Sequence, residues 1–332
     1  MHIVKTTTKS PTFDDAIELT SDDMQAVDSL ISKSLQSDVA LVSQVSEYIV
    51  RSGGKRLRPV IVLLAARACG YEGDKHIGAA AIVEFIHTAT LLHDDVVDSS
   101  SRRRGQDSAN TVFGNQASVL VGDFLYSRAF QMMVNIDNMR VMQIMADATN
   151  TIAAGEVMQL MNVHDPDTTE DAYRQVIYRK TARLFEAGAQ VAAVLADRSQ
   201  NYEVAMMRYG QHLGTAFQLV DDALDFNASA EEMGKNLGDD LAEGKATLPL
   251  IYAMEKGSAD DRELIRKAIL EGGLEQLEKI TAIVESTGAL QYTAARAQEA
   301  ADTATSALSD IPDSDYKQAL IAIAEYAVQR RF

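Results

Sequence analysis

Cysteine and tryptophan are nearly absent from this chain of 332 residues, which has one cysteine, Cys69, and no tryptophan. A single thiol excludes an internal disulfide framework and a metal site built from several cysteines, so a buried, inert thiol is expected. Proline is also scarce, with 5 residues, and glycine accounts for only 19. Few helix breakers among stretches rich in Ala, Leu, Met, Gln and Glu predict an all-α protein.

Long apolar runs and positive charge are lacking as well. No run approaches the roughly 20 apolar residues that cross a bilayer. The N-terminal segment has no apolar signal core and contains Asp14, Asp15 and Glu18. Only 31 Lys and Arg oppose 48 Asp and Glu, a net charge of -17 that argues against nonspecific nucleic-acid binding. We expect a soluble, cytoplasmic protein with no transmembrane segment and no nucleic-acid partner.

Turn residues divide the chain into long helical segments without a composition shift that would separate domains. Residues 1–19 are expected to form a flexible N-terminal leader, and residues 20–332 a single all-helical domain. No stretch has the alternation of a convincing strand. Helices are expected over residues 20–52, 59–69, 76–97, 117–135, 140–161, 169–198, 203–226, 247–255 and from 260 onward with a break near Pro312, and polar loops over 99–110 and 228–245.

Two aspartate clusters share one spacing, and each follows an apolar run that is typical of a buried helix: Asp94-Asp95-x-x-Asp98 and Asp221-Asp222-x-x-Asp225. Residues four apart lie on one helix face, so each cluster stacks carboxylates along one side. Such carboxylates are costly unless a cation neutralises them. Mg²⁺ binds one or two carboxylates and completes its shell with water and phosphate.

The paired clusters therefore predict a clamp that holds a diphosphate through several Mg²⁺ ions. One such cluster in so acidic a chain would be explained more simply as a solvated helix face. The repetition of the spacing behind two apolar helices, with basic segments nearby, favours the functional interpretation.

Basic residues gather in two places that suit an anion. Lys55, Arg56 and Arg58 lie on a glycine turn directly before an expected helix, where backbone N–H groups and the helix dipole favour negative charge. Arg adds bidentate oxygen binding and Lys a point charge. The run 102–104 consists of three arginines beside the first aspartate cluster. Each stretch alone could equally be a solvated surface turn.

Isolated polar residues within apolar helices are more ambiguous. Gln218 lies three residues before Asp221 and shares its face, and Lys180-Thr181 lies within another, otherwise apolar-rich helix. The hydroxyl oxygen of Thr181 and the amide oxygen of Gln218 could face a developing cation, although ordinary intrahelical hydrogen bonding is the simpler explanation. His87 lies two turns before the first cluster and could equally be a core residue. The glycine-rich segment 234–245 could be a flap whose Lys235 and Lys245 reach phosphate, but it is not a P-loop.

In their order along the chain, these motifs resemble the trans-isoprenyl diphosphate synthases, from about residue 20 to the end. The resemblance rests on Gly-Lys-Arg-x-Arg-Pro, both Asp-rich motifs, Arg-Arg-Gly, Lys-Thr and the Gly-Lys…Gly-Asp-Asp…Gly-Lys segment. Residues 85–93 and 113–124 resemble the long-chain branch, in particular the bacterial members that make the octaprenyl side chain of respiratory quinones. Ser99 to Ser101 and Phe226 depart from the pattern, where relatives often carry acids and Tyr.

The resemblance implies an all-α, isoprenoid-synthase-type bundle of long helices around a deep central apolar cavity, usually as a homodimer. It implies three Mg²⁺ ions with substrate bound, and the following site. Metal binding is expected of Asp94, Asp98 and Asp221, supported by Asp95, Asp222 and Asp225. The allylic diphosphate is expected to bind Arg103, Lys180 and Lys235, and isopentenyl diphosphate to bind Lys55, Arg58, His87 and Arg104. Thr181 and Gln218 are expected to stabilise the cation, and Lys180, Thr181, Gln218 and Lys235 are the residues expected to be catalytic.

The implied reaction is repeated head-to-tail addition of isopentenyl diphosphate to an allylic diphosphate, with farnesyl diphosphate the expected primer and octaprenyl diphosphate the expected product. The released diphosphate would take the final proton. Transient membrane contact could accompany product release. Alternatives are a synthase of another chain length, a class I terpene cyclase, or a noncatalytic partner subunit. The repeated Asp-rich motif argues against the cyclase, and the retention of all six aspartates argues against the subunit.

The growing tail is expected to run from the first aspartate cluster back along its helix. Ala89 and Thr90, small residues near that cluster, would leave the top of the tunnel open, and Ala89→Phe would then cap it and shorten the product. Met133 and Met145, with Met132 as a further candidate, are expected at the floor. Methionine commonly fills gaps in a core, which is an equally good explanation for any one of them.

Overall fold

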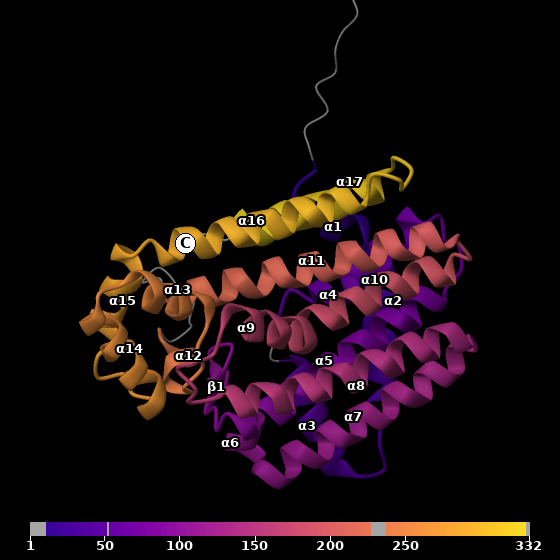
Figure 1. Ribbon diagram of the computed structural model, residues 1–332. Coiled ribbons are helices and arrows are strands. Elements are labelled where there is room, and N and C mark those ends of the chain that lie inside the picture. The colour runs from indigo at the N-terminus through magenta and orange to yellow at the C-terminus, as the bar shows by residue number, and fades with distance from the viewer. Residues whose placement is uncertain (1–10, 52, 227–236, 330–332) are drawn as a thin grey trace, which may run out of the picture.

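A computed structural model describes residues 11–51, 53–226 and 237–329, and these residues are almost entirely helical (Figure 1). No helix among them is long and apolar enough to cross a membrane. In chain order the elements are α1 (Phe13–Leu19), α2 (Ser21–Ser34), α3 (Ala40–Arg51), α4 (Leu57–Ala68), α5 (Lys75–Val97), β1 (Arg102–Arg103), β2 (Gln106–Asp107), α6 (Ala109–Phe113), α7 (Asn115–Ile136), α8 (Met139–Asn162), α9 (Glu170–Ile177), the π-helical turn η1 (Tyr178–Ala182), α10 (Arg183–Leu195), α11 (Gln200–Leu224), α12 (Asp239–Ala242), α13 (Leu248–Lys256), α14 (Ala259–Glu271), α15 (Leu277–Ser286), α16 (Ala289–Ala307) and α17 (Asp315–Gln329).

Helix α10 lies at the centre of the bundle, because it packs against α4, α5, α8 and α11. One large apolar core joins α2, α3, α5, α7, α8 and α10, and a second joins α1, α4, α10, α11, α16 and α17. Figure 1 shows α16 and α17 lying along α11 on one side, while α7 and α8 lie on the other. Short helices α12 to α15 gather at one end of the bundle. The expected all-α bundle of long helices is confirmed.

The N-terminal residues that the structure describes differ from the expected flexible leader. Residues 13–19 form α1, which begins with a capping box between Thr12 and Asp15. Ala16 is fully buried, and the ring of Phe13 stacks on that of Tyr326 with centroids 4.1 Å apart. These contacts dock α1 on α17, so the leader interpretation is wrong for residues 13–19; residues 1–10 lie outside the described part.

Three expected segments are interrupted. The helix expected over 20–52 is split between α2 and α3, and the helix expected over 169–198 contains the π-helical turn η1. The expected loop 99–110 holds the short antiparallel ladder β1–β2, in which Arg103 pairs with Gln106. Arg104 and Gly105 turn the ladder with φ angles of 51° and 78°, as a tight two-residue hairpin requires.

Candidate active site

The first aspartate cluster forms the last turn of α5 and meets two lysines from distant elements. Lys180 Nζ, from η1, lies 3.3 Å from Asp94 Oδ2, and Lys245 Nζ, from the segment before α13, lies 3.1 Å from Asp98 Oδ2. Burial opposes the charge of both lysines, but the surrounding carboxylates outweigh it and hold each pKa above its usual value. The lysines are therefore cationic and occupy the carboxylates that were expected to bind metal.

A further acid belongs to this arrangement. Glu156 Oε2, on α8, lies 2.7 Å from Lys180 Nζ, so Lys180 bridges Glu156 and Asp94. Burial and the charge of Asp94 raise the pKa of Glu156 to about 7 despite the lysine. Sequence reasoning missed Glu156, because one acid among many on helix surfaces carries no distinguishing pattern.

Asp95 is fully buried and turns away from the two lysines toward the hairpin. The guanidinium of Arg103 donates to Asp95 Oδ1 from both Nε, at 2.7 Å, and a terminal nitrogen, at 2.6 Å. Asn110 donates to the backbone oxygen of Asp95 at 3.0 Å. Burial raises the pKa of Asp95, and Arg103 opposes that shift. In this geometry Arg103 orders the end of α5, and Asp95 acts as its anchor.

In the second cluster, Asp222 and Asp225 accept hydrogen bonds from groups on other elements as well as their own helix. Asp222 accepts from the hydroxyl of Tyr173 at 2.5 Å and from the amide of Gln218 at 2.7 Å. Asp225 accepts from the backbone N–H groups of residues 239 and 240 at 3.2 and 3.3 Å, at the start of α12. Burial, followed by the charge of Asp240, raises the pKa of both Asp222 and Asp225 to about 8. Burial and neighbouring acids therefore disfavour the ionised form of both carboxyl groups, which a cation would favour.

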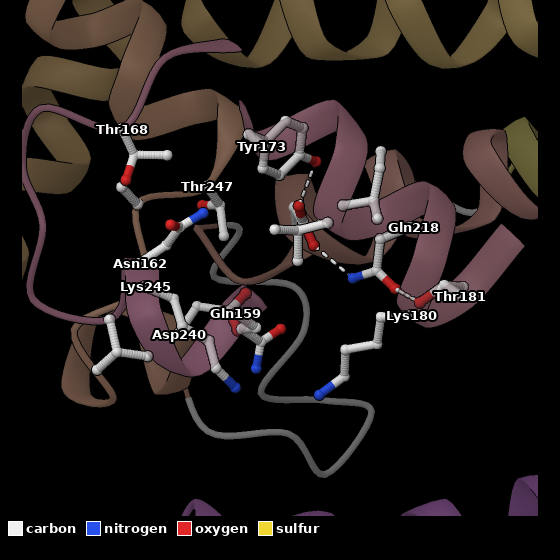
Figure 2. A pocket seen from close by; sticks show the side chains of 15 residues that line it. Gln159, Asn162, Thr168, Tyr173, Lys180, Thr181, Gln218, Asp240, Lys245 and Thr247 are labelled. Carbon is white, nitrogen blue, oxygen red and sulfur yellow. Dashed lines mark hydrogen bonds between the residues drawn. The ribbon is translucent and has the colours of Figure 1, made fainter. Parts of the chain in front are cut away.

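Lys180 and Thr181 lie in the π-helical turn η1, a feature that often marks functional sites. The Thr181 hydroxyl donates to Gln218 Oε1 at 2.9 Å, which brings together the two residues expected to face a cation. Figure 2 shows Lys180, Thr181, Gln218, Asp240 and Lys245 around one small pocket. Its volume is about 120 Å³, and its lining adds Gln159, Asn162, Val163, Thr168, Tyr173, Val176, Ile177, Asp222, Ala246 and Thr247.

The basic turn before α4 is built around Arg58, which is partly exposed. Its Nη1 lies 3.1 Å from His87 Nε2, and its guanidinium carbon lies 4.5 Å from the centre of the Phe185 ring. Burial lowers the pKa of Arg58 to about 10, so it remains cationic at neutral pH. Burial and the neighbouring arginines hold the pKa of His87 well below its usual value, so its neutral ring accepts from Arg58. Arg58 and His87, both expected to hold isopentenyl diphosphate, thus lie in direct contact.

Arg104 reaches the same turn from the hairpin. A β-carbon built on Gly54 would lie 2.6 Å from Arg104 Nη1, so the guanidinium passes directly over the glycine. Burial raises the pKa of Glu84, on α5, and the charges of Arg56, Arg58 and Arg104 oppose that shift. Glu84 is therefore the acid that faces this arginine cluster, and no pattern in the sequence singled it out.

Lys55 lies slightly apart from these arginines. Its ammonium bonds the hydroxyl of Tyr326 on α17 and lies 5.7 Å from the centre of the Phe13 ring on α1. The exposed side chain is thus held between the two ends of the described chain. Lys235, the remaining expected diphosphate ligand, lies outside the described residues.

A larger cavity of about 660 Å³ opens beside Asp94 and Asp98 and continues between α5, α7 and α8. Its α8 wall runs from Ala146 to Leu160, about 21 Å at 1.5 Å per residue. Gln159 and Val163 line both this cavity and the small polar pocket, so the two spaces adjoin. The remaining lining is Thr90, His93, Val97, Asp123, Tyr126, Phe130, Thr149, Asn150, Ile152, Ala153, Glu156, Val157 and Leu160.

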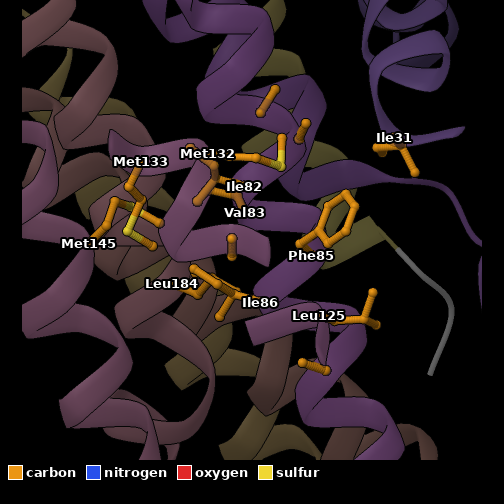
Figure 3. Packing of buried hydrophobic residues seen from close by; sticks show 14 of the residues in the cluster. Ile31, Ile82, Val83, Phe85, Ile86, Leu125, Met132, Met133, Met145 and Leu184 are labelled. Atoms are coloured by element: carbon orange, nitrogen blue, oxygen red, sulfur yellow. The ribbon is translucent and has the colours of Figure 1, made fainter. Parts of the chain in front are cut away.

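The expected chain-length residues divide between the wall and the core. Thr90 lines the cavity, whereas Ala89 is fully buried in the core and does not. Met132, Met133 and Met145 also belong to that core, and Figure 3 shows Met133 beside Met145. Since Met133 follows the lining residue Phe130 by three positions, it lies about one turn beyond the wall, where a floor would be.

The donors suit Mg²⁺ that is shared with a phosphate ligand. Over residues 11–51, 53–226 and 237–329, no group of three His, Cys, Asp or Glu side chains converges closely enough to hold an ion alone. Mg²⁺ characteristically needs only one or two carboxylates when phosphate oxygens and water complete its octahedron. Asp94 and Asp98 line the larger cavity and, like the half-buried Asp221, are hard oxygen donors, so the residues fit such an ion.

This fold and site define an all-α isoprenoid synthase. The family model described as polyprenyl synthetase matches residues 39–287, and the chain belongs to that family of transferases. The chain is 55% identical over 314 residues to the octaprenyl diphosphate synthase of Escherichia coli K12, covering 94% of this chain and 97% of that one. It is 48% identical over 317 residues to the geranyl-diphosphate-specific all-trans-nonaprenyl-diphosphate synthase of Rhodobacter capsulatus, covering 95% and 97%.

Solved structures agree with this assignment. The polyprenyl synthase of Caulobacter crescentus, complexed with calcium and isoprenyl diphosphate, superposes with a TM-score of 0.93 at 44% identity, covering 98% of this chain and 99% of that one. A decaprenyl diphosphate synthase from Rhodobacter capsulatus gives a TM-score of 0.90 at 43% identity, covering 96% and 99%.

Proposed function

We propose that this chain is a Mg²⁺-dependent octaprenyl diphosphate synthase, which adds isopentenyl diphosphate repeatedly to farnesyl diphosphate to build the side chain of a quinone. The carrying observation is the long cavity that begins at Asp94 and Asp98 and is bounded by α5, α7 and α8. A tail anchored by its diphosphate at this mouth would grow along the apolar wall. The octaprenyl product is supported by the relative at 55% identity, and a slightly longer product is the alternative that the nonaprenyl relative favours.

In this proposal the allylic diphosphate replaces the carboxylates that Lys180 and Lys245 now contact. Asp94, Asp98 and Asp221 would hold Mg²⁺, three ions when substrate is bound, and these ions would supply positive charge that favours departure of the diphosphate. The complex of a relative with calcium and isoprenyl diphosphate supports divalent metal use. Lys180 and Lys245, with Arg103 and Lys235, would supply the remaining positive charge.

Isopentenyl diphosphate would bind the basic turn, held by Arg58, His87, Arg104 and Lys55. Binding there orients its double bond toward the allylic carbon, so that attack is intramolecular in effect. The oxygens of Thr181 and Gln218 face the pocket and would stabilise positive charge without trapping it. The released diphosphate can accept the final proton, which makes a separate general base unnecessary.

Incubation of the purified protein with radiolabelled isopentenyl diphosphate, farnesyl diphosphate and Mg²⁺, followed by chromatography of the dephosphorylated products, tests this proposal. Octaprenol as the main product is the expected result. A ladder ending at another length would correct the product but retain the reaction class. Cyclised terpenes would indicate a class I terpene cyclase, and no product with either farnesyl or geranyl diphosphate would indicate a noncatalytic partner subunit.

A homodimer is part of the same proposal. Helices α7 and α8 expose large apolar side chains, including Leu120 at 66%, Val134 at 63% and Met161 at 77% exposure. Apolar side chains gathered on neighbouring helices are typical of a surface that a second copy covers. Light scattering coupled to size-exclusion chromatography would detect the dimer. We further propose a cytoplasmic site of action with transient membrane contact at product release, since the product tail is apolar.

A further inference from the structure

Four side chains form a continuous hydrogen-bonded series behind the small polar pocket, and Figure 2 shows its three links as dashed lines. Tyr173, on α9, donates to Asp222 Oδ2 at 2.5 Å. The amide nitrogen of Gln218 donates to Asp222 Oδ1 at 2.7 Å. The hydroxyl of Thr181 donates to Gln218 Oε1 at 2.9 Å. Tyr173 is 5% exposed and Asp222 2% exposed, so water cannot readily replace either partner.

The direction of each link follows from the chemistry of the groups. The amide nitrogen of Gln218 can only donate, to Asp222 Oδ1, and its carbonyl oxygen can only accept, from Thr181. The Gln218 amide therefore directs its nitrogen to Asp222, and its carbonyl oxygen must face Thr181 and the pocket. The orientation of the amide thus depends on where the Asp222 carboxylate is held, and the hydroxyl of Tyr173 is the donor that holds its other oxygen.

We propose that Tyr173 is a positioning residue for prenyl transfer, which fixes Asp222 so that the carbonyl oxygen of Gln218 faces the developing allylic cation. Without the tyrosine hydroxyl, the carboxylate can rotate and the amide can turn over. An inverted amide would present N–H hydrogens, with their partial positive charge, to a carbon that is itself becoming positive. Burial holds the pKa of Tyr173 well above its usual value, so the hydroxyl keeps its hydrogen at any working pH.

Replacement of the hydroxyl alone tests this role, which rests on the proposed function. Tyr173→Phe should lower kcat by about 5-fold to 150-fold, the range for leaving a buried hydrogen-bonding partner unsatisfied. The KM for each substrate should stay within about twofold, because Tyr173 contacts the positioning series and not a diphosphate. Tyr292→Phe is the matched control: its hydroxyl bonds Glu170 at 3.0 Å, at the start of the same helix, and it does not line the pocket.

A double-mutant cycle separates positioning from general support of the fold. In a Gln218→Ala background, Tyr173→Phe should change kcat by less than about twofold, because the amide it positions is gone. Equal losses in both backgrounds would overturn the role, as would an unchanged kcat in the single variant or a rise confined to KM. Thermal unfolding of the parent, the two single variants and the double variant shows whether a loss of stability accompanies the loss of turnover.

The outcome for the parent protein keeps the two proposals distinct. A parent that elongates farnesyl diphosphate, with a fully active Tyr173→Phe variant, overturns only the positioning role. A parent that does not elongate any allylic diphosphate overturns the proposed function and the role together.

Discussion

Replacement of Gly54 by alanine should separate binding of isopentenyl diphosphate from stability of the fold. Gly54 has a φ angle of +133°, and an added β-carbon would lie 2.6 to 2.8 Å from three atoms of the Arg104 guanidinium. Arg104 is an exposed, flexible side chain, so it should move aside while the backbone stays in place. The expected consequence is that Arg104 no longer points into the basic turn.

The adjacent glycine provides a matched control. Gly53 also has a positive φ, +83°, but a β-carbon there would meet nothing within 4 Å. Both alanine variants should be destabilised by left-handed backbone strain of about 1–2 kcal/mol. Only Gly54→Ala should also lose the contact of Arg104 with a diphosphate, which at about 1.5–3 kcal/mol for a charged hydrogen bond corresponds to roughly 10-fold to 150-fold in KM.

Steady-state kinetics with one substrate varied and the other saturating measures this difference. Gly54→Ala should raise the KM for isopentenyl diphosphate by at least about tenfold over Gly53→Ala, with the KM for the allylic substrate nearly equal in the two variants. Similar melting temperatures would show that the strain is shared. If both variants had the same KM for isopentenyl diphosphate, or if the allylic KM rose instead, the assignment of Arg104 to this substrate would be wrong.

Other perturbations give distinct expected results. Asp94→Ala and Asp221→Ala should each abolish turnover without unfolding the protein, and removal of divalent ions with EDTA should also abolish turnover. Near-normal turnover of either variant at saturating Mg²⁺ would contradict a metal clamp built from the two aspartate clusters. Arg58→Ala should raise the KM for isopentenyl diphosphate more than that for the allylic substrate, and kinetics showing the reverse would exchange the two sites. Thr90→Phe should block the cavity wall and shorten the product on chromatography, unless the tail runs elsewhere. Met133→Ala should leave the product unchanged or lengthen it, and a shorter product would exclude Met133 from the floor.

The sequence predicted the parts of the site whose signal is local. The aspartate clusters, ending α5 and α11, are defined by spacing within one helical turn, and the turn around Gly54 by adjacent glycines and cations. Tyr173 gave no signal, because its bond to Asp222 joins residues 49 positions apart and depends on how two helices pack. Lys55 likewise meets Tyr326 only through tertiary structure.

The expected leader and the expected position of Ala89 differ from the structure for different reasons. The start of α1 has a local sequence signal, because Thr12 is followed three residues later by Asp15, as a capping box requires. The placement of Ala89 in the core and Thr90 on the cavity wall could not be derived in the same way. Adjacent residues on a helix point about 100° apart, and only the packing of α5 against its neighbours decides which one meets the cavity.

The π-helical turn η1 sets the rotational phase between two halves of one long helix. A π turn accommodates one residue more than an α turn within about the same rotation, so η1 takes up one extra residue while α9 and α10 keep their relative phase. Tyr173 on α9 can therefore contact Asp222 while Leu184 and Phe185 on α10 remain buried in the core. A regular α-helical segment with the same number of residues would instead rotate α9 relative to α10 by about 100°, the rotation of one residue, and would separate the site from the packing.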